Sequence, residues 1–142
     1  MPAQDSYKMP DAAKAAGIPH KDLTRHLGRK VIKFPDSDPG KGHQRRCSLD
    51  SIYMIAIGHA LIKAFVSPTT AMSLAQLFFE PQRGRSSGKP FVSGKTLLLV
   101  TDGIGSVINL EADQDILTHL KEATIVVDIG AITQTVNARL LS

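Results

Sequence analysis

Residues 7–16 read YKMPDAAKAA, and this stretch decides the fold of the N-terminal half. Its alanines favour a short helix, because alanine is the best helix former. Pro10 suits a first helical turn, and Gly17 follows as a residue that can end the helix in a left-handed conformation. The first element of the chain is therefore expected to be a helix of about two turns.

A second short helix is expected directly after this one. Ile18-Pro19 separates it from the first helix, and the second helix should run from Pro19 or His20 to Leu27 or Gly28. Leu23 and Leu27 are four residues apart and therefore share one face. Two short helices joined by a tight turn that contains glycine predict a helix-turn-helix.

A β-hairpin, or wing, is expected next. Residues 35–42 are dense in turn residues, and they separate Val31-Ile32-Lys33-Phe34 from the basic run His43-Gln44-Arg45-Arg46. Ser48 then offers an N-cap to a helix over about residues 49–64. Ser67-Pro68 opens another helix that should continue through Phe79.

The C-terminal half shows a different pattern. After a linker over residues 81–91, rich in Pro, Gly, Ser and basic residues, we expect strands over 95–100 and 106–110, a polar helix over 112–120, a strand over 123–127 and a helix over 128–141. The fold class is therefore α+β. The expected layout is a winged helix-turn-helix domain (1–80), the linker (81–91) and a small α/β dimerisation region (92–142).

The last helix carries an apolar stripe, formed by Ile129, Ile132, Val136 and Leu140. This stripe could pair with its copy across a two-fold axis. Alternatively, it could cover the tail's own sheet. The sequence leaves these two interpretations open.

The charge is unevenly distributed. Residues 1–46 carry ten Lys/Arg against five Asp/Glu, whereas residues 92–142 carry three against six. A basic half suggests contact with a polyanion. No apolar run reaches the roughly 18 residues of a membrane span, and the N-terminus lacks the pattern of a secretion signal. The single Cys47 cannot form an internal disulfide. We expect a cytoplasmic, nucleoid-associated protein.

The order of helix, turn, helix, wing and long helix resembles the MerR-type winged helix-turn-helix family. The resemblance rests on Tyr7-Lys8-Met9, on residues 12–18 and on the wing-to-helix junction over residues 42–52. It covers residues 7 to about 79. The family's long dimerising helix and its sensing cysteines have no counterpart here. The resemblance implies that the second helix enters the major groove and that the wing meets the flanking backbone.

The resemblance supplies the candidate contacts to DNA. Arg25 is the candidate base reader, because a guanidinium can pair bidentately with guanine O6 and N7. Most of the others are expected to meet phosphates, which position a protein without specifying sequence. Each could instead be an ordinary solvated side chain. The full set is His20, Lys21, Thr24, Arg25, Arg29, Lys30, Lys33, Lys41, His43, Arg45 and Arg46.

Enzymatic interpretations find little support. Ser93-Gly94-Lys95-Thr96 ends like a P-loop, but Lys89 stands where that motif requires its first glycine. The five histidines show no metal-binding spacing. Cys47 beside two arginines could have a lowered thiol pKa, although a small residue at the edge of the core explains it more simply. No catalytic residue, metal or cofactor is expected.

The leading hypothesis is a homodimeric, sequence-specific regulator of transcription that binds double-stranded DNA. One alternative is an excisionase-like recombination directionality factor, or another architectural DNA-binding factor of a phage or mobile element. A third, from a different class, is a protein-interaction adaptor whose basic half only resembles a DNA reader. The operator, the direction of regulation and any small-molecule effector are not readable from the sequence.

Overall fold

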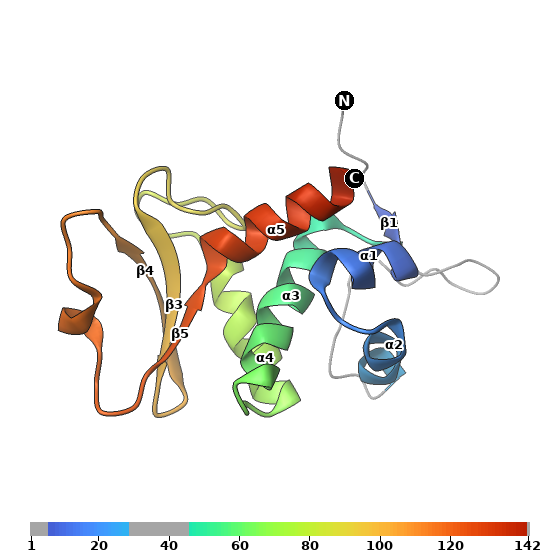
Figure 1. The fold of residues 1–142 in the computed structure, drawn as a ribbon, viewed down its shortest axis with the longest axis horizontal. Helices are drawn as coiled ribbons and strands as arrows, with labels where there is room; N and C mark the ends of the chain where they lie inside the picture. Colours follow the sequence, from blue (N-terminus) through green and yellow to red (C-terminus); the bar gives the residue numbers. More distant parts are fainter. Residues whose placement is uncertain (1–5, 29–45, 142) are drawn as a thin grey trace.

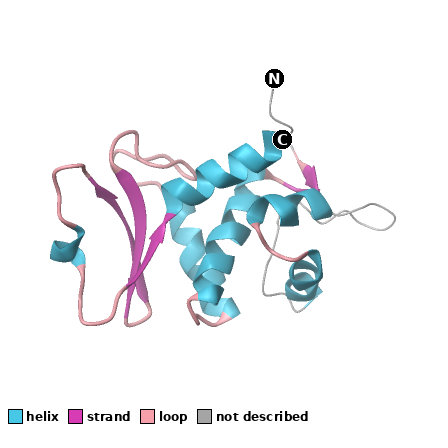
Figure 2. Cartoon of the chain, viewed as in Figure 1, coloured by secondary structure: helices cyan, strands magenta, loops and turns pink. Residues whose placement is uncertain are grey.

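The computed structural model describes residues 6–28 and 46–141, and it shows an α+β fold (Figures 1 and 2). The predicted fold class is thereby confirmed at this level. Most of the expected wing, residues 31–45, lies outside the described residues. The elements, in order, are β1 (Tyr7–Lys8), α1 (Met9–Ala16), α2 (His20–Gly28), β2 (Arg46–Cys47), α3 (Leu49–Lys63), α4 (Pro68–Ala75), the 3₁₀ helix η1 (Gln76–Phe79), β3 (Lys95–Thr101), β4 (Ile104–Leu110), the 3₁₀ helix η2 (Ile116–His119), β5 (Ile125–Asp128) and α5 (Ile129–Leu141).

The turn between α1 and α2 forms as its sequence predicts. Gly17 has φ 77°, in the left-handed region that glycine tolerates without strain. The Gly17 amide donates to the Lys14 carbonyl at 3.2 Å, and the Ile18 amide donates to the Ala13 carbonyl at 3.1 Å. This pair of bonds is the Schellman arrangement, which satisfies carbonyls at the end of a helix. The chain then enters α2 within three residues.

Helix α3 forms the centre of the molecule. The Ser48 side chain caps it by accepting from the Ser51 amide at 3.1 Å. Buried residues lie around its whole circumference, as expected for a helix enclosed by others. In Figure 1, α1, α4 and α5 are arranged around it.

The sheet has the order β4-β3-β5, and both pairings are antiparallel. Asp102 and Gly103 form the two-residue turn between β3 and β4, and both have positive φ, 52° and 76°. This is the Asp-Gly hairpin turn whose twist matches that of paired strands. One face of the sheet contributes to the main core, through Leu98, Val100, Val107 and Val127.

Several predicted elements differ from those in the structure. The polar helix expected over residues 112–120 is a series of turns with only η2 in 3₁₀ geometry, because none of these residues is buried and no tertiary packing supports a longer helix. The helix expected through Phe79 ends at Ala75 and tightens into η1. The last strand begins at Ile125 instead of Ala123, and it ends at Asp128, where α5 was expected to start.

A single hydrophobic cluster joins the two halves of the chain. It includes Ala12, Ala15 and Ile18 from the N-terminal half, together with Val127 and Val136 from the C-terminal half. Helix α5 contacts α1, α3 and β3. The regions over residues 1–80 and 92–142 thus share one core. Within the described residues, no helix is both long and apolar enough to cross a membrane.

The segment over residues 81–91, expected as a linker, is organised around Arg85. Arg85 is only 4% exposed, and its guanidinium donates to a ring of main-chain carbonyls. It also lies 5.2 Å from the centre of the Phe78 ring and 5.8 Å from that of Phe91. Burial lowers the pKa of Arg85 from its usual range. The segment is therefore folded against η1 and is not a free connection.

Candidate nucleic-acid interface

Helix α2 lies at the periphery of the molecule and is held on its inner side by α1 (Figure 1). Leu23 anchors it, since this side chain is completely buried. His20, Lys21, Thr24 and Arg25 are exposed. The helix thus buries Leu23 and presents His20, Lys21, Thr24 and Arg25 to solvent.

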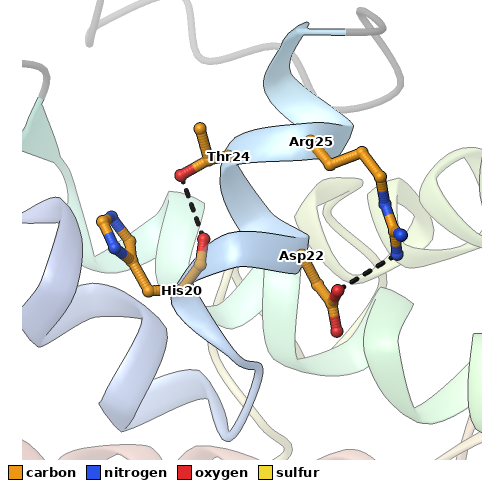
Figure 3. A network of polar contacts seen from close by, with 4 residues as sticks. All are labelled: His20, Asp22, Thr24 and Arg25. Atoms are coloured by element: carbon orange, nitrogen blue, oxygen red, sulfur yellow. Dashed lines mark hydrogen bonds and ion pairs between the residues drawn. The ribbon is translucent and has the colours of Figure 1, made fainter.

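Figure 3 shows the polar contacts on α2. The Thr24 hydroxyl donates to the His20 carbonyl one turn earlier, at 3.0 Å. Arg25 Nη2 donates to Asp22 Oδ1 at 3.1 Å, and the two side chains are 53% and 26% exposed. An exposed pair of this kind adds little to stability. Its main effect is to restrict where the Arg25 guanidinium can point.

Strand β2, where the described part of the structure resumes at Arg46, lies beside α1. Strand β2 pairs with β1 in antiparallel register, with Tyr7 opposite Cys47 and Lys8 opposite Arg46. Arg46 is exposed, but its Nε donates to Ser6 Oγ at 2.7 Å and its Nη2 donates to the Ser6 carbonyl at 3.0 Å. Arg46 therefore ties the N-terminal strand in place.

Cys47 lies inside this arrangement. Its side chain is fully buried, and its Sγ is 3.2 Å from the Met9 sulfur. A buried thiol is poorly accessible to oxidants or metals. The structure is consistent with the simpler interpretation of Cys47 as a small residue of the core.

The structure thus brings together four of the predicted DNA contacts, His20, Lys21, Thr24 and Arg25, on the exposed side of α2. A fifth, Arg46, lies on β2. The other six, Arg29, Lys30, Lys33, Lys41, His43 and Arg45, lie outside the described residues.

The proposed dimer stripe on α5 faces inward. Ile129 is fully buried and Val136 is 2% exposed. Ile132 and Leu140 are partly buried and pack against the same core. In this fold Ile129 and Val136 cannot meet a second copy, since they already pack against this chain's own helices and sheet. The stripe packs against this chain's own sheet, which is the second of the two interpretations of its sequence, and it also packs against α1 and α3.

Two polar contacts that join the halves were not anticipated from the sequence. Tyr53 of α3 donates to Asn137 Oδ1 of α5 at 2.6 Å, and Arg139 Nη1 of α5 donates to the Ala15 carbonyl of α1 at 3.2 Å. Burial raises the pKa of Tyr53, the side-chain hydrogen bond with Asn137 partly opposes this, and the charges of Asp50 and Tyr7 raise it further. Both contacts span more than 80 residues, so no local pattern could have revealed them.

Over residues 6–28 and 46–141, no group of three or more His, Cys, Asp or Glu side chains could hold a metal ion. The exposed face of α2 offers donors and positive charge, which suit a polyanion. No model of a known protein family matches the chain, and no curated protein is similar to it.

Proposed function

We propose that this protein is a sequence-specific regulator that binds double-stranded DNA through a winged helix-turn-helix whose recognition helix is α2. The observation that carries the proposal is the two-sided character of α2. Leu23 is completely buried, while His20, Lys21, Thr24 and Arg25 are exposed on a helix at the edge of the molecule. A helix held by its inner face can enter the major groove without disturbing the core.

The side chains of α2 suggest a division of roles. Arg25 would read guanine, because its planar guanidinium can donate two parallel hydrogen bonds to O6 and N7. Asp22 accepts from one Arg25 nitrogen at 3.1 Å. This bond would hold the Arg25 side chain in fewer orientations before binding, so that less conformational entropy is lost when DNA binds. Lys21 would meet a phosphate. His20, at the first residue of α2, would lie close to a phosphate approached by the helix N-terminus.

The remaining basic residues complete the proposal. Arg29, Lys30, Lys33, Lys41, His43 and Arg45 would make the wing contacts to the flanking backbone, and Arg46 would support them through Ser6. The protein would act as a homodimer in the cytoplasm, associated with the nucleoid. Because Ile129 and Val136 are buried, the dimer would form through a surface other than the α5 stripe.

A salt titration of duplex binding tests the proposal. The full chain should bind a generic duplex of about 30 base pairs at low salt, and the affinity should fall steeply with salt, since each phosphate contact adds about 0.9 to the negative slope of log K against log salt. Lys21→Ala should reduce that slope by about one. Lys121→Ala, an exposed lysine of the acidic half, should leave it unchanged and serves as the matched control.

The same titration can contradict the proposal. If the full chain binds no duplex at low salt, or if Lys21→Ala and Lys121→Ala behave alike, α2 is not a DNA-binding helix. Sedimentation of the free protein measures the dimer separately. A footprint at promoters would support a role in transcription, whereas a footprint confined to recombination attachment sites would contradict it.

A further inference from the structure

A groove lies between the segment that leads into β3 and the first half of α5. Both segments can be followed in Figure 1, and the groove is lined mainly by residues 88–96 and 128–137. Its volume is about 590 Å³, within the range of roughly 300–1,000 Å³ for sites that bind small molecules. Gly130 and Ala131 keep the α5 side of the groove open, because both residues are small. The groove therefore has room for an organic ligand.

Two lysines bring positive charge to one side of the groove. Lys89 and Lys95 both line it, and both residues are exposed. No residue that the structure describes forms an ion pair with either lysine, so both ammonium groups are available to a ligand. An ammonium group donates up to three hydrogen bonds and is a common partner of phosphate. This side of the groove is therefore suited to a phosphate group.

Asp128, the last residue of β5, also lines the groove, and among the described lining residues it alone is acidic. Its Oδ1 accepts from the Ala131 amide at 2.9 Å, at the start of α5. Its other oxygen, Oδ2, takes no part in that bond. A carboxylate accepts hydrogen bonds from hydroxyl groups, whereas it repels a phosphate. Asp128 therefore suits a ligand whose hydroxyl groups stand apart from its phosphate.

An aromatic ring and two amide side chains complete the groove. Phe91 is partly exposed, and its ring is held by the Arg85 guanidinium, which lies 5.8 Å from the ring centre. On α5, Gln134 is exposed, and Asn137 keeps its amide nitrogen as a donor because its Oδ1 accepts from Tyr53. Aromatic side chains stack on nucleobases, and Asn or Gln amides pair with the edges of bases. These residues therefore suit a planar nitrogen heterocycle.

We propose that this groove binds a ribonucleoside monophosphate. The phosphate would lie between Lys89 and Lys95, the ribose hydroxyls would donate to Asp128, and the base would stack on Phe91 and meet the amides of α5. Each part of the ligand thus corresponds to one feature of the groove, whereas a free phosphate would use the lysines alone. The inference does not depend on the proposed binding of DNA, because the described residues that line the groove include none of α2.

Adenosine 5′-monophosphate (AMP) is a suitable probe, together with molecules that each lack one part of it. Adenosine lacks the phosphate, deoxyadenosine monophosphate lacks one ribose hydroxyl, and ribose 5-phosphate lacks the base. We expect AMP to shift backbone amide resonances within residues 88–96 and 128–137 of the full chain, with a dissociation constant on the order of 0.1 mM. Each of the other molecules should bind at least about 5-fold more weakly, through a lost hydrogen bond to a charged group or lost stacking.

Variants assign each contact through the molecule that lacks the matching part. Lys95→Gln should weaken AMP by about 3- to 10-fold and leave adenosine unchanged, while Lys121→Gln, at an exposed lysine outside the groove, should affect neither. Phe91→Leu should weaken AMP but not ribose 5-phosphate. Asp128→Asn, which keeps a side-chain cap for α5, should bring AMP and its deoxy form to a similar affinity. Amide spectra would first confirm that each variant is folded.

Three results with the wild-type chain would overturn the proposal: no shifts at roughly 2 mM AMP, well above the expected dissociation constant; shifts confined to α2; or binding of AMP no tighter than that of adenosine or ribose 5-phosphate. Equal effects of Lys95→Gln and Lys121→Gln on AMP would also contradict it. A separate duplex titration distinguishes the two proposals. If AMP binds in the groove and no duplex binds at low salt, the proposed DNA-binding function fails alone; the reverse result refutes only the nucleotide site.

Discussion

Arg85 Nη1 donates a 2.6 Å hydrogen bond to the carbonyl of Phe78, and the same guanidinium lies 5.2 Å from the centre of the Phe78 ring. Further bonds run to the carbonyls of Glu80 at 2.8 Å and Lys89 at 3.2 Å, and to Gln82 Oε1 at 2.7 Å. One buried cation thereby binds several main-chain carbonyls of the same segment, which stabilises the passage from the helical part to the sheet.

Replacement of Arg85 should be strongly destabilising. Arg85→Ala leaves several main-chain carbonyls without their donor, and we expect the free energy of unfolding to fall by about 3 kcal/mol or more. Arg83→Ala is the matched control, because Arg83 is exposed in the same turn, and it should change stability by less than about 0.5 kcal/mol. Urea denaturation measures both. Equal effects of the two substitutions would refute a structural role for Arg85.

The contact between α3 and α4 depends on the absence of a side chain at position 58. A Cβ on Gly58 would overlap Met72 Sδ. Gly58→Ala should therefore lower the free energy of unfolding by about 1–3 kcal/mol, although alanine is the better helix former. Gly130→Ala in α5, where a Cβ would come no closer than 3.5 Å to other atoms, should be neutral or stabilising. In a Met72→Ala background the cost of Gly58→Ala should disappear.

Tyr53 should make the free energy of unfolding fall as the pH becomes alkaline. Burial raises its pKa above the ordinary value of 10.0, so the unfolded chain loses this proton first. The contribution of Tyr53 to the free energy of unfolding is complete below pH 10 and is lost as the pH rises through the folded-state pKa. Tyr53→Phe should lose about 1 kcal/mol at neutral pH, through the missing bond to Asn137, and should show a shallower alkaline decline.

Asn137→Ala is the control for this prediction. It removes the same hydrogen bond but keeps the ionisable phenol, so the alkaline decline should persist. Urea denaturation at a series of pH values from neutral to about 11 measures both variants. A decline as steep in Tyr53→Phe as in the wild-type chain would show that another group is responsible.

Arg25 should determine part of the sequence preference. A preferred site is first selected from a pool of randomised duplexes, and binding is then measured on that site and on a scrambled one. Arg25→Ala should cost about 1–3 kcal/mol on the selected site and relax the preference for one guanine. Lys21→Ala should weaken both duplexes alike. An unaltered preference in Arg25→Ala would mean that another residue reads that base.

The N-terminal half should not fold without the C-terminal half. A fragment of residues 1–91 lacks Val127, Ile129 and Val136, which close the common core beside α1 and α3. We expect this fragment to show no cooperative thermal transition, because the apolar surface of those helices would be exposed to water. Circular dichroism and the dispersion of amide resonances measure this. A cooperative transition would establish the two regions as independent domains.

Much of the local structure could be predicted from the sequence because local interactions determine it. Gly17 ends α1, Ser48 caps α3, and Asp102-Gly103 turns the hairpin, each through contacts within a few residues. The exposed polar face of α2 likewise follows from the position of Leu23. The polar segment over residues 112–120 was predicted incorrectly, because most of the stability of a helix in a protein comes from packing, and none of these residues is buried.

The tertiary structure alone decided how the halves combine. The apolar stripe of α5 needed a partner, and periodicity cannot tell a second copy from α1, α3 and the sheet of the same chain. The hydrogen bonds from Tyr53 to Asn137 and from Arg139 to the Ala15 carbonyl arise from segments brought together by the common core. The sequence of α2 determined which residues it presents to solvent, because Leu23 dictates its buried side. What surrounds these residues of α2 depends on hydrophobic burial between segments that are far apart in the sequence, and no local pattern encodes it.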